Sequence, residues 1–505
     1  MNKAVQDTFQ SALDIPPTDT VTVRLLVKGT YSRLYQIQTS GPKSVQRHIM
    51  RVCLPVYPKY KTLGEVAALN AVRSRTNLTV TVPKVISYSV ERNNLNATGF
   101  EWIIMDYVPG TPASKLWREM TMAQKEILVN QIAEFQSQFI ASKFKGIGSL
   151  LPADAEGDLD PKAEPLVGRL VHPFFFTDEA FDHDVVPSRA FRSSQEFMSA
   201  LLQLAAKLNR PSRPAKEPES VRTRRYDIAA KLAELMPQIF PPILLDEPEE
   251  TILSHNNMTL DNILIDPTDY KITGILGWSS ATASPAWVDW HIPYFLIDIT
   301  KPREVMPKEN KFADLSHSDF QAWGCRTPYS PNGKCEKYWQ AVMDYDATQL
   351  LRVYCRRMCD LGVWKCETER ETLKRDFWVA VQALFIPPRD GDVSDELDRV
   401  DKWLQAVRAW DSNTDFPKRS RLQKKLKWKP EDETDSDDEK DSDDEKDSDD
   451  EKEAEDVLVG MSDEQYFYHP VSMMSSETPL MDEEDVEREI ARQRSLEGED
   501  FLLYP

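Results

Sequence analysis

The sequence lacks the features that direct a chain to a membrane or out of the cell. No apolar run approaches the ~18 residues that a membrane-spanning helix needs. The opening stretch, MNKAVQDTFQSALDIPP, contains neither the basic nor the apolar segment of a secretory signal peptide. We therefore expect no membrane association and an intracellular location, with the cytoplasm as the main compartment.

Cysteines with the close spacing of a zinc site are also missing. Of the 6 cysteines, five lie between Cys325 and Cys366, which at first suggests a metal. No C-x-x-C pair is present, however, and Cys355 and Cys359 have the spacing of one helix face. We favour structural thiols in a reducing compartment over a zinc site.

A basic surface of the kind that binds nucleic acid is absent as well. The formal net charge is −21, but it is unevenly spread. Residues 431–505 carry 30 acidic and 6 basic side chains, whereas residues 1–430 carry 53 acidic and 56 basic ones. The main part of the chain is nearly neutral, so we expect no nucleic-acid partner, and the low pI describes a tail.

The tail combines two opposite charge patterns. Residues 418–429, KRSRLQKKLKWK, are basic, and three copies of D-S-D-D-E-K follow at 435–452. These repeats are far shorter than the ~20–50 residues of a solenoid unit and have no apolar face, so we expect a disordered acidic tail. It is a candidate binding segment for a protein partner. The basic stretch fits either a solvated helix end or a nuclear import signal, which leaves a nuclear location open.

Hydrophobic periodicity predicts an α+β fold with two lobes. Residues 21–53 alternate as three strands, 61–75 have helical spacing, and two further strands end near Val108. Helical patterns then dominate, with capping pairs at Thr121–Gln124 and Ser193–Glu196 and short strands at 252–253, 263–265 and 272–276. We expect a β-rich lobe at 1–108, a helical lobe at 109–415 and the tail at 416–505.

Several residues occur in the order that phosphoryl transfer requires. Gly29 lies between two strands, where backbone N–H groups can approach phosphate, and Arg51 in the third strand is a candidate cation. Glu65 on the following helix can pair with Arg51 and orient it. Taken singly, a turn glycine and a surface ion pair worth under ~1 kcal/mol remain the alternatives.

An ordered series of blocks then resembles a known family. The blocks are GTYSRLYQI, RHIMRV, KTLGEVAALNAVR, TVPKVISYS, WIIMDYVPG, LSHNNMTLDNILID, YKITGILGW and PAWVDW. Together they resemble the aminoglycoside phosphotransferase (choline-kinase-like) family of small-molecule kinases, over roughly residues 21–300. This resemblance implies the two-lobed protein-kinase-like fold, with ATP and magnesium as cofactors where a member is active. It also implies that the lobe at 1–108 binds nucleotide and that residues 254–290 contain a catalytic-type loop.

The resemblance also implies roles for individual residues. The nucleotide site would contain Gly29, Thr30, Tyr31 and Ser32 over the phosphates, Arg51 at the position of the phosphate-binding lysine, Glu65 as its partner, and Asp106 and Val108 against adenine. His255 would open the catalytic loop, Asn262 would be a metal ligand, and Asp289 would brace the loop.

Two departures from the family pattern remove acids. In H-x-D-x-x-x-x-N the aspartate positions the attacking hydroxyl, but here that place holds Asn257, which carries no charge and takes no proton. In ITGILGW, Gly277 stands where the family has the aspartate that holds magnesium. Asp261 and Asp266 are the neighbouring acids that a shifted geometry would have to use.

These losses give three hypotheses for function. The first is a pseudokinase, or a severely weakened kinase, that acts as a nucleotide- or partner-binding module. The second is an active ATP-dependent kinase for a hydroxyl of an amino-alcohol, sugar or related metabolite. The third is a structural protein that binds no nucleotide.

Overall fold

The computed structural model describes residues 1–29, 31–41, 45–54, 57–75, 80–91, 96–152, 165–171, 187–211, 217–241, 247–288, 292–297, 302–307, 336–363, 369–385 and 393–409. Several predictions fall outside this part of the chain. They concern Thr30, Asp289, the cysteines at 325, 335 and 366, and the basic and acidic segments of the predicted tail.

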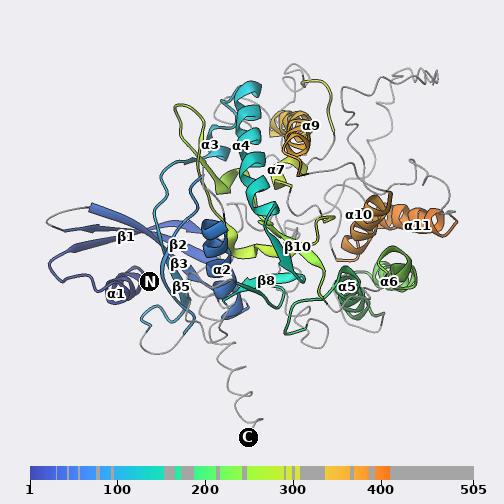
Figure 1. Cartoon of the computed structure of the whole chain (residues 1–505), viewed down its shortest axis with the longest axis horizontal. Coiled ribbons are helices and arrows are strands. Elements are labelled where there is room, and N and C mark those ends of the chain that lie inside the picture. The colour runs from blue at the N-terminus through green and yellow to red at the C-terminus, as the bar shows by residue number, and fades with distance from the viewer. Residues whose placement is uncertain are drawn as a thin grey trace, which may run out of the picture.

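The N-terminal lobe is built on a five-stranded antiparallel sheet (Figure 1). Its strands are β1 (Thr20–Lys28), β2 (Ser32–Ser40), β3 (Val45–Cys53), β5 (Glu101–Asp106) and β4 (Val85–Ser89), in that spatial order. The strands predicted from alternation are therefore present. Helix α1 (Asn2–Ala12), which the periodicity did not reveal, contacts β1 and buries Val5 and Phe9 in the sheet's outer core.

Helix α2 (Tyr60–Arg75) covers the other face of this sheet and joins the two lobes. Its residues Val66, Leu69 and Val72 are buried in a core that continues into the second lobe. Helix α2 also packs against β8 (Gly148–Leu151), where Gly64 lies next to the Leu150 carbonyl oxygen. The lobes thus share one hydrophobic core.

Two small sheets carry the catalytic-type loop. The first has the order β7 (Lys143–Lys145), β10 (Glu250–Ser254), β13 (Thr282–Ser284), β8 and β9 (Leu166–Val167). The second has the order β12 (Ile272–Ile275), β11 (Ile263–Ile265) and β6 (Thr111–Pro112). The loop runs from β10 to β11 and includes the 3-10 helix η2 (Leu260–Asn262); η3 (Trp278–Ser280) follows β12.

Helices make up the rest of the second lobe. They are α3 (Ala113–Leu116), α4 (Met122–Ile140), α5 (Ser194–Leu208), α6 (Glu219–Ile239), α7 (Tyr294–Ile297), α9 (Glu336–Asp360), α10 (Glu369–Gln382) and α11 (Val393–Ala409). Both predicted capping pairs form: the Thr121 and Ser193 hydroxyls accept the N–H groups of Gln124 and Glu196. The α+β, two-lobed prediction is confirmed.

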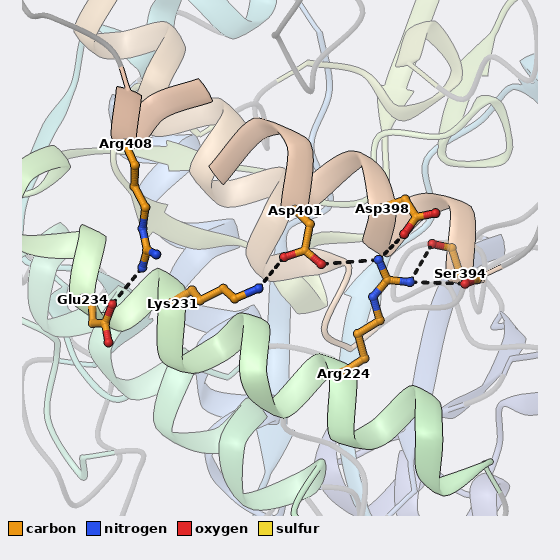
Figure 2. A network of polar contacts seen from close by, with 7 residues as sticks. All are labelled: Arg224, Lys231, Glu234, Ser394, Asp398, Asp401 and Arg408. Carbon is orange, nitrogen blue, oxygen red and sulfur yellow. Dashed lines mark hydrogen bonds and ion pairs between the residues drawn. The ribbon is translucent and has the colours of Figure 1, made fainter. Parts of the chain in front are cut away.

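Helices α5, α6, α10 and α11 form a subdomain with its own hydrophobic core (Figure 1). Figure 2 shows the ionic network that links α6 to α11. Lys231 Nζ lies 2.6 Å from one carboxylate oxygen of Asp401, and Arg224 contacts the other carboxylate oxygen as well as Asp398. Farther along, Arg408 pairs with Glu234 at 2.7 Å. Charge on one side and apolar packing on the other attach α11 to the lobe.

Within the described residues no helix is long and apolar enough to cross a membrane. Among the described residues, Cys53, Cys355 and Cys359 form no disulfide bond, and no three potential metal ligands of the His, Cys, Asp or Glu type lie together.

Candidate functional site

The Arg51–Glu65 ion pair predicted from the sequence forms between β3 and α2. Arg51 Nη1 lies 2.8 Å from Glu65 Oε2, and the two side chains are 11% and 3% exposed. Such a buried pair holds both groups in fixed directions, since separating them would leave a charge without a partner in a low-dielectric environment. The role of the pair in phosphate binding stays a prediction.

A second buried cation, which the sequence analysis missed, lies beside this pair. Lys61 is 3% exposed, and its ammonium lies 3.5 Å from the Tyr31 carbonyl oxygen. It occurs four residues before Glu65, so both lie on the same face of α2. This four-residue spacing from Glu65 was the signal in the sequence that could have identified Lys61. Arg51 and Lys61 both act electrostatically on the buried Cys53 thiol, although burial dominates and raises the pKa of Cys53.

The predicted phosphate-covering loop is a tight hairpin turn between β1 and β2. The Gly29 N–H donates to the Ser32 carbonyl oxygen at 2.8 Å, and the Leu54 N–H donates to the Tyr31 carbonyl oxygen at 3.0 Å. The Gly29 N–H is therefore already used and is not available to a phosphate. Thr30 lies outside the described residues. The cations beneath the turn, rather than its glycine, offer the stronger attraction for an anion.

The segment between the lobes passes closely over β12. Val108 is buried against Gly274, where a Cβ would come within 2.5 Å of the valine side chain. The Asp106 carboxylate accepts the Lys84 N–H, which fixes the end of β5. Within the described residues no backbone hydrogen bond uses the Val108 N–H, so this donor is open to an adenine ring, as the predicted role requires.

His255 connects the catalytic-type loop to the strand that precedes Gly277. The Asn257 N–H donates to His255 Nδ1 at 3.2 Å, so the ring proton is on Nε2, which donates to the Leu276 carbonyl oxygen at 2.8 Å. Complete burial lowers the pKa of His255 to about 4, despite the opposing effect of the hydrogen bond to Leu276. His255 is therefore neutral near pH 7 and positions the loop.

Asn257, at the position where the resemblance implies a catalytic acid, is buried. It is 2% exposed, and its side-chain oxygen Oδ1 has no hydrogen-bond partner among the described residues. Its neighbour Asn256 has a left-handed φ of 60° and donates to the Ser280 carbonyl oxygen and to Thr282 Oγ1. The loop is thus held by amide groups, and its central side chain is uncharged.

Asn262 fills the space that a side chain at position 277 would need. Gly277 has a φ of 82°, and a Cβ built there would lie 2.7 Å from Cγ and from Nδ2 of Asn262. The same Nδ2 donates to the Asn257 carbonyl oxygen at 2.9 Å. The two sequence departures are therefore adjacent in space, and one amide links them.

The neighbouring acids do not replace the lost ones. Asp261 Oδ1 accepts the Ser114 hydroxyl from α3 at 2.5 Å, which directs that carboxylate toward α3. Asp266 lies at the opposite end of β11 from Asn262, where it accepts the Thr268 N–H and hydroxyl in an exposed turn. These hydrogen bonds lower the pKa of Asp266. These contacts therefore do not support a role for Asp261 or Asp266 in place of the acids that are absent at positions 257 and 277.

Magnesium does not fit the residues present on this side of the site. The ion prefers anionic oxygen ligands in a near-octahedral arrangement. Asn262 supplies one neutral oxygen, Gly277 supplies no side-chain oxygen, the Asp261 carboxylate accepts the Ser114 hydroxyl, and Asp266 lies at the other end of β11. Asp289 is outside the described residues.

The fold brings the two sides of the site together. Helix α2, which carries Lys61 and Glu65, contacts η3 directly after Gly277. Thr81 bridges to Gly274, and its carbonyl oxygen accepts the Ile275 N–H at 3.0 Å. The arrangement therefore places cations on the β-lobe side opposite a loop that lacks its acids.

Comparison with known proteins gives a consistent family match. The model of the phosphotransferase enzyme family matches residues 22–309. Subtelomeric hrmA-associated cluster proteins of two Aspergillus fumigatus strains are 23% identical over 315 residues, which cover 54% of this chain and 59% of theirs. The chain thus aligns with less than two thirds of these relatives' length.

Solved structures with some similarity include two bacterial proteins. One is a candidate aminoglycoside phosphotransferase from Ralstonia eutropha, with 13% identity over 82% of this chain and 91% of that chain and a TM-score of 0.40. The other is the macrolide 2'-phosphotransferase of Brachybacterium faecium, with 14% identity over 77% of this chain and 100% of that chain and a TM-score of 0.33.

Proposed function

Because the chain belongs to the phosphotransferase enzyme family, we propose that its two-lobed region is a nucleotide-binding module in which phosphoryl transfer is lost or severely weakened. The observation that carries this proposal is the contact between Gly277 and Asn262. The asparagine amide occupies the space of the missing metal-binding side chain, and it donates to the backbone of Asn257, at the position of the missing base.

The fold of the site is kept, whereas the acidic side chains that phosphoryl transfer uses are missing. Asn257 cannot accept the proton of an attacking hydroxyl, and losing general-base help typically reduces the rate by ~10²–10⁴. Without a carboxylate at position 277, no described residue on this side fixes a metal against the phosphates. Phosphoryl transfer depends on both functions, since the charge that develops on the phosphoryl oxygens has to be neutralised.

The parts that bind a nucleotide are better preserved. The Arg51–Glu65 pair, the buried Lys61 and the Val108 N–H support binding of phosphates and adenine between the lobes. Binding without turnover would suit a protein that responds to nucleotide or presents a nucleotide-dependent surface to a partner. The acidic segment after residue 430 is the candidate for the partner contact.

Ligand-dependent stability and turnover, measured on the full chain, test the proposal. ATP and ADP should raise the melting temperature, because a ligand at 100 times its Kd stabilises a protein by ~2.7 kcal/mol. ADP production with magnesium should stay at background over a panel of amino-alcohols and sugars. The comparison protein is the double variant Asn257→Asp, Gly277→Asp, checked for folding because the new Asp has to displace the Asn262 amide.

Two outcomes would reject the proposal. If the unaltered protein turns over ATP on any acceptor as fast as the double variant, the chain is an active small-molecule kinase. If neither ATP nor ADP changes the melting temperature at millimolar concentration, the chain is a structural protein that binds no nucleotide.

A further inference from the structure

Lys61 is a buried cation whose charge nothing in the described part of the chain balances. Its residue is 3% exposed, and its contacts are the Tyr31 carbonyl oxygen at 3.5 Å and the Tyr31 ring, whose centre lies 5.9 Å from Nζ. Neither contact carries charge. An ammonium removed from water without a carboxylate is costly, so an anionic ligand would stabilise it.

The nearest acids are already committed to other groups. Glu65 pairs with Arg51 at 2.8 Å. Glu101 is also buried, and its carboxylate accepts the Lys59 N–H at 2.6 Å and the Thr62 hydroxyl at 2.5 Å. Among the described residues, Arg51 and Lys61 both act electrostatically on the neighbouring Cys53, a single acid, Glu65, forms an ion pair with Arg51, and Arg51 Nε has no hydrogen-bond partner.

On the opposite side, the described positions 257, 262 and 277 carry no negative charge. Asn257 and Gly277 replace the two acids that would repel a bare polyphosphate and attract a metal, and Asn262 is neutral. A site with this balance favours a ligand of high negative charge. ATP without magnesium carries more negative charge than its magnesium complex, because the divalent ion neutralises part of the phosphate charge.

We propose that Arg51 and Lys61 form an anion site that binds the phosphates of a nucleoside di- or triphosphate without a divalent metal, and that magnesium weakens this binding. This inference rests on the proposed nucleotide-binding function and specifies its ligand form. Lys61 here takes part of the charge-neutralising role that a metal has in active phosphotransferases. The Lys61 ammonium and the Arg51 guanidinium would both contact phosphate oxygens, with charge-assisted hydrogen bonds.

Isothermal titration of the full chain with ATP tests the inference directly. Titrations in EDTA and in excess magnesium should give the lower Kd in EDTA. In EDTA, Lys61→Gln should raise the Kd about tenfold, as expected when one hydrogen bond to a charged group is lost. Lys271→Gln is the matched control, since that side chain is 71% exposed on the β11–β12 turn, and it should leave the Kd unchanged.

The possible results separate this inference from the proposed function. Binding that requires magnesium would overturn the inference and leave a nucleotide-binding module. An unchanged Kd in folded Lys61→Gln would also overturn it. Absence of ATP and ADP binding in both buffers would reject the proposed function itself. The comparison of EDTA with magnesium uses the unaltered protein, so it stands even if Lys61→Gln does not fold.

Discussion

The two sides of the candidate site hold their residues by different means. On the catalytic-loop side, uncharged side chains hold the loop in place. His255, Asn256 and Asn262 donate to backbone carbonyl oxygens, and Trp278 packs against the His255 ring. On the β-lobe side, charged side chains hold one another in place: Arg51 and Glu65 form a buried ion pair, and Lys61 is buried beside them.

The difference separates the groups that fix the shape of the site from the charged groups that a reaction or a ligand would use. The loop keeps a backbone shape that depends on buried hydrogen bonds, each of which would be expensive to break. The hydrogen bonds that hold the loop come from His255, Asn256 and Asn262, so the loop keeps its shape without a carboxylate at position 257 or 277. Under the proposed function, the charges on the other side would serve ligand binding whether or not a reaction follows.

The largest expected effect tests whether packing holds the catalytic-loop side. Trp278 is fully buried, with ring centres of His255 and Phe139 at 4.4 Å and 5.9 Å. Trp278→Ala should lower the free energy of unfolding by about 3–5 kcal/mol, because it leaves a cavity beneath the loop. Chemical denaturation measures this, and a loss under about 1 kcal/mol would show that the loop is held by other means.

The neutrality of His255 can be tested with pH. Its pKa is about 4 in the folded chain and near 6.5 in the unfolded chain, so the unfolded state takes up the proton first as pH falls. Stability from this group is complete above pH 6.5, falls as the pH drops toward 4 and then levels off. The loss should be about 3 kcal/mol.

A His255→Gln variant isolates this contribution from that of other titrating groups. Unfolding free energies of both proteins, measured at several pH values between 7 and 4, should converge as the pH falls. Parallel curves would mean that His255 is not kept neutral by the fold, and the contrast between a neutral and a charged side would lose its main support.

The charged side should respond to loss of the acid that balances Arg51. Glu65→Gln keeps the shape of the side chain but leaves Arg51 without its carboxylate, beside the buried Lys61. We expect a loss of about 2 kcal/mol in unfolding free energy, since hydrogen bonds to charged groups contribute on that order. Denaturation in EDTA with and without ATP should show a larger stabilisation by ATP in the variant than in the unaltered protein.

The smallest effect concerns the contact between Asn262 and Gly277. Gly277 and Gly99 both have left-handed φ values, of 82° and 69°, but only Gly277 has atoms near the position of a Cβ. Gly277→Ala should therefore cost about 1 kcal/mol more than Gly99→Ala, because both share the backbone strain and one adds a steric contact. Equal losses would mean that the amide moves away freely.

Sequence periodicity was sufficient for the larger elements of the fold. The strands of the N-terminal lobe, α2 and the β11–β12 hairpin follow from alternating or helical spacing, which reports one buried face. The sheet containing β7, β8, β9, β10 and β13 was not predicted as a unit. Its strands are short and come from distant segments, so their pairing depends on tertiary contacts that no local pattern contains.

The candidate site likewise contains contacts that the sequence predicted and contacts that it did not. The Arg51–Glu65 contact could be predicted because its members occur in a fixed order along strand and helix. Lys61 was missed although its spacing from Glu65 was visible, since burial of a lysine cannot be inferred from position alone. The use of the Gly29 N–H within its own turn, and the amide of Asn262 over Gly277, depend on three-dimensional distances of a few ångströms.

Helix α11 is attached to the lobe by contacts that respond differently to the solvent. It is the last element that the structure describes. Its ionic contacts with α6 are partly exposed and are screened by salt, whereas Trp403 and Leu404 are buried in the subdomain core. A force that pulls α11 away from α6 would therefore meet two kinds of resistance. The resistance to that pull would be set by ionic strength at the helix surface and by tryptophan packing beneath it.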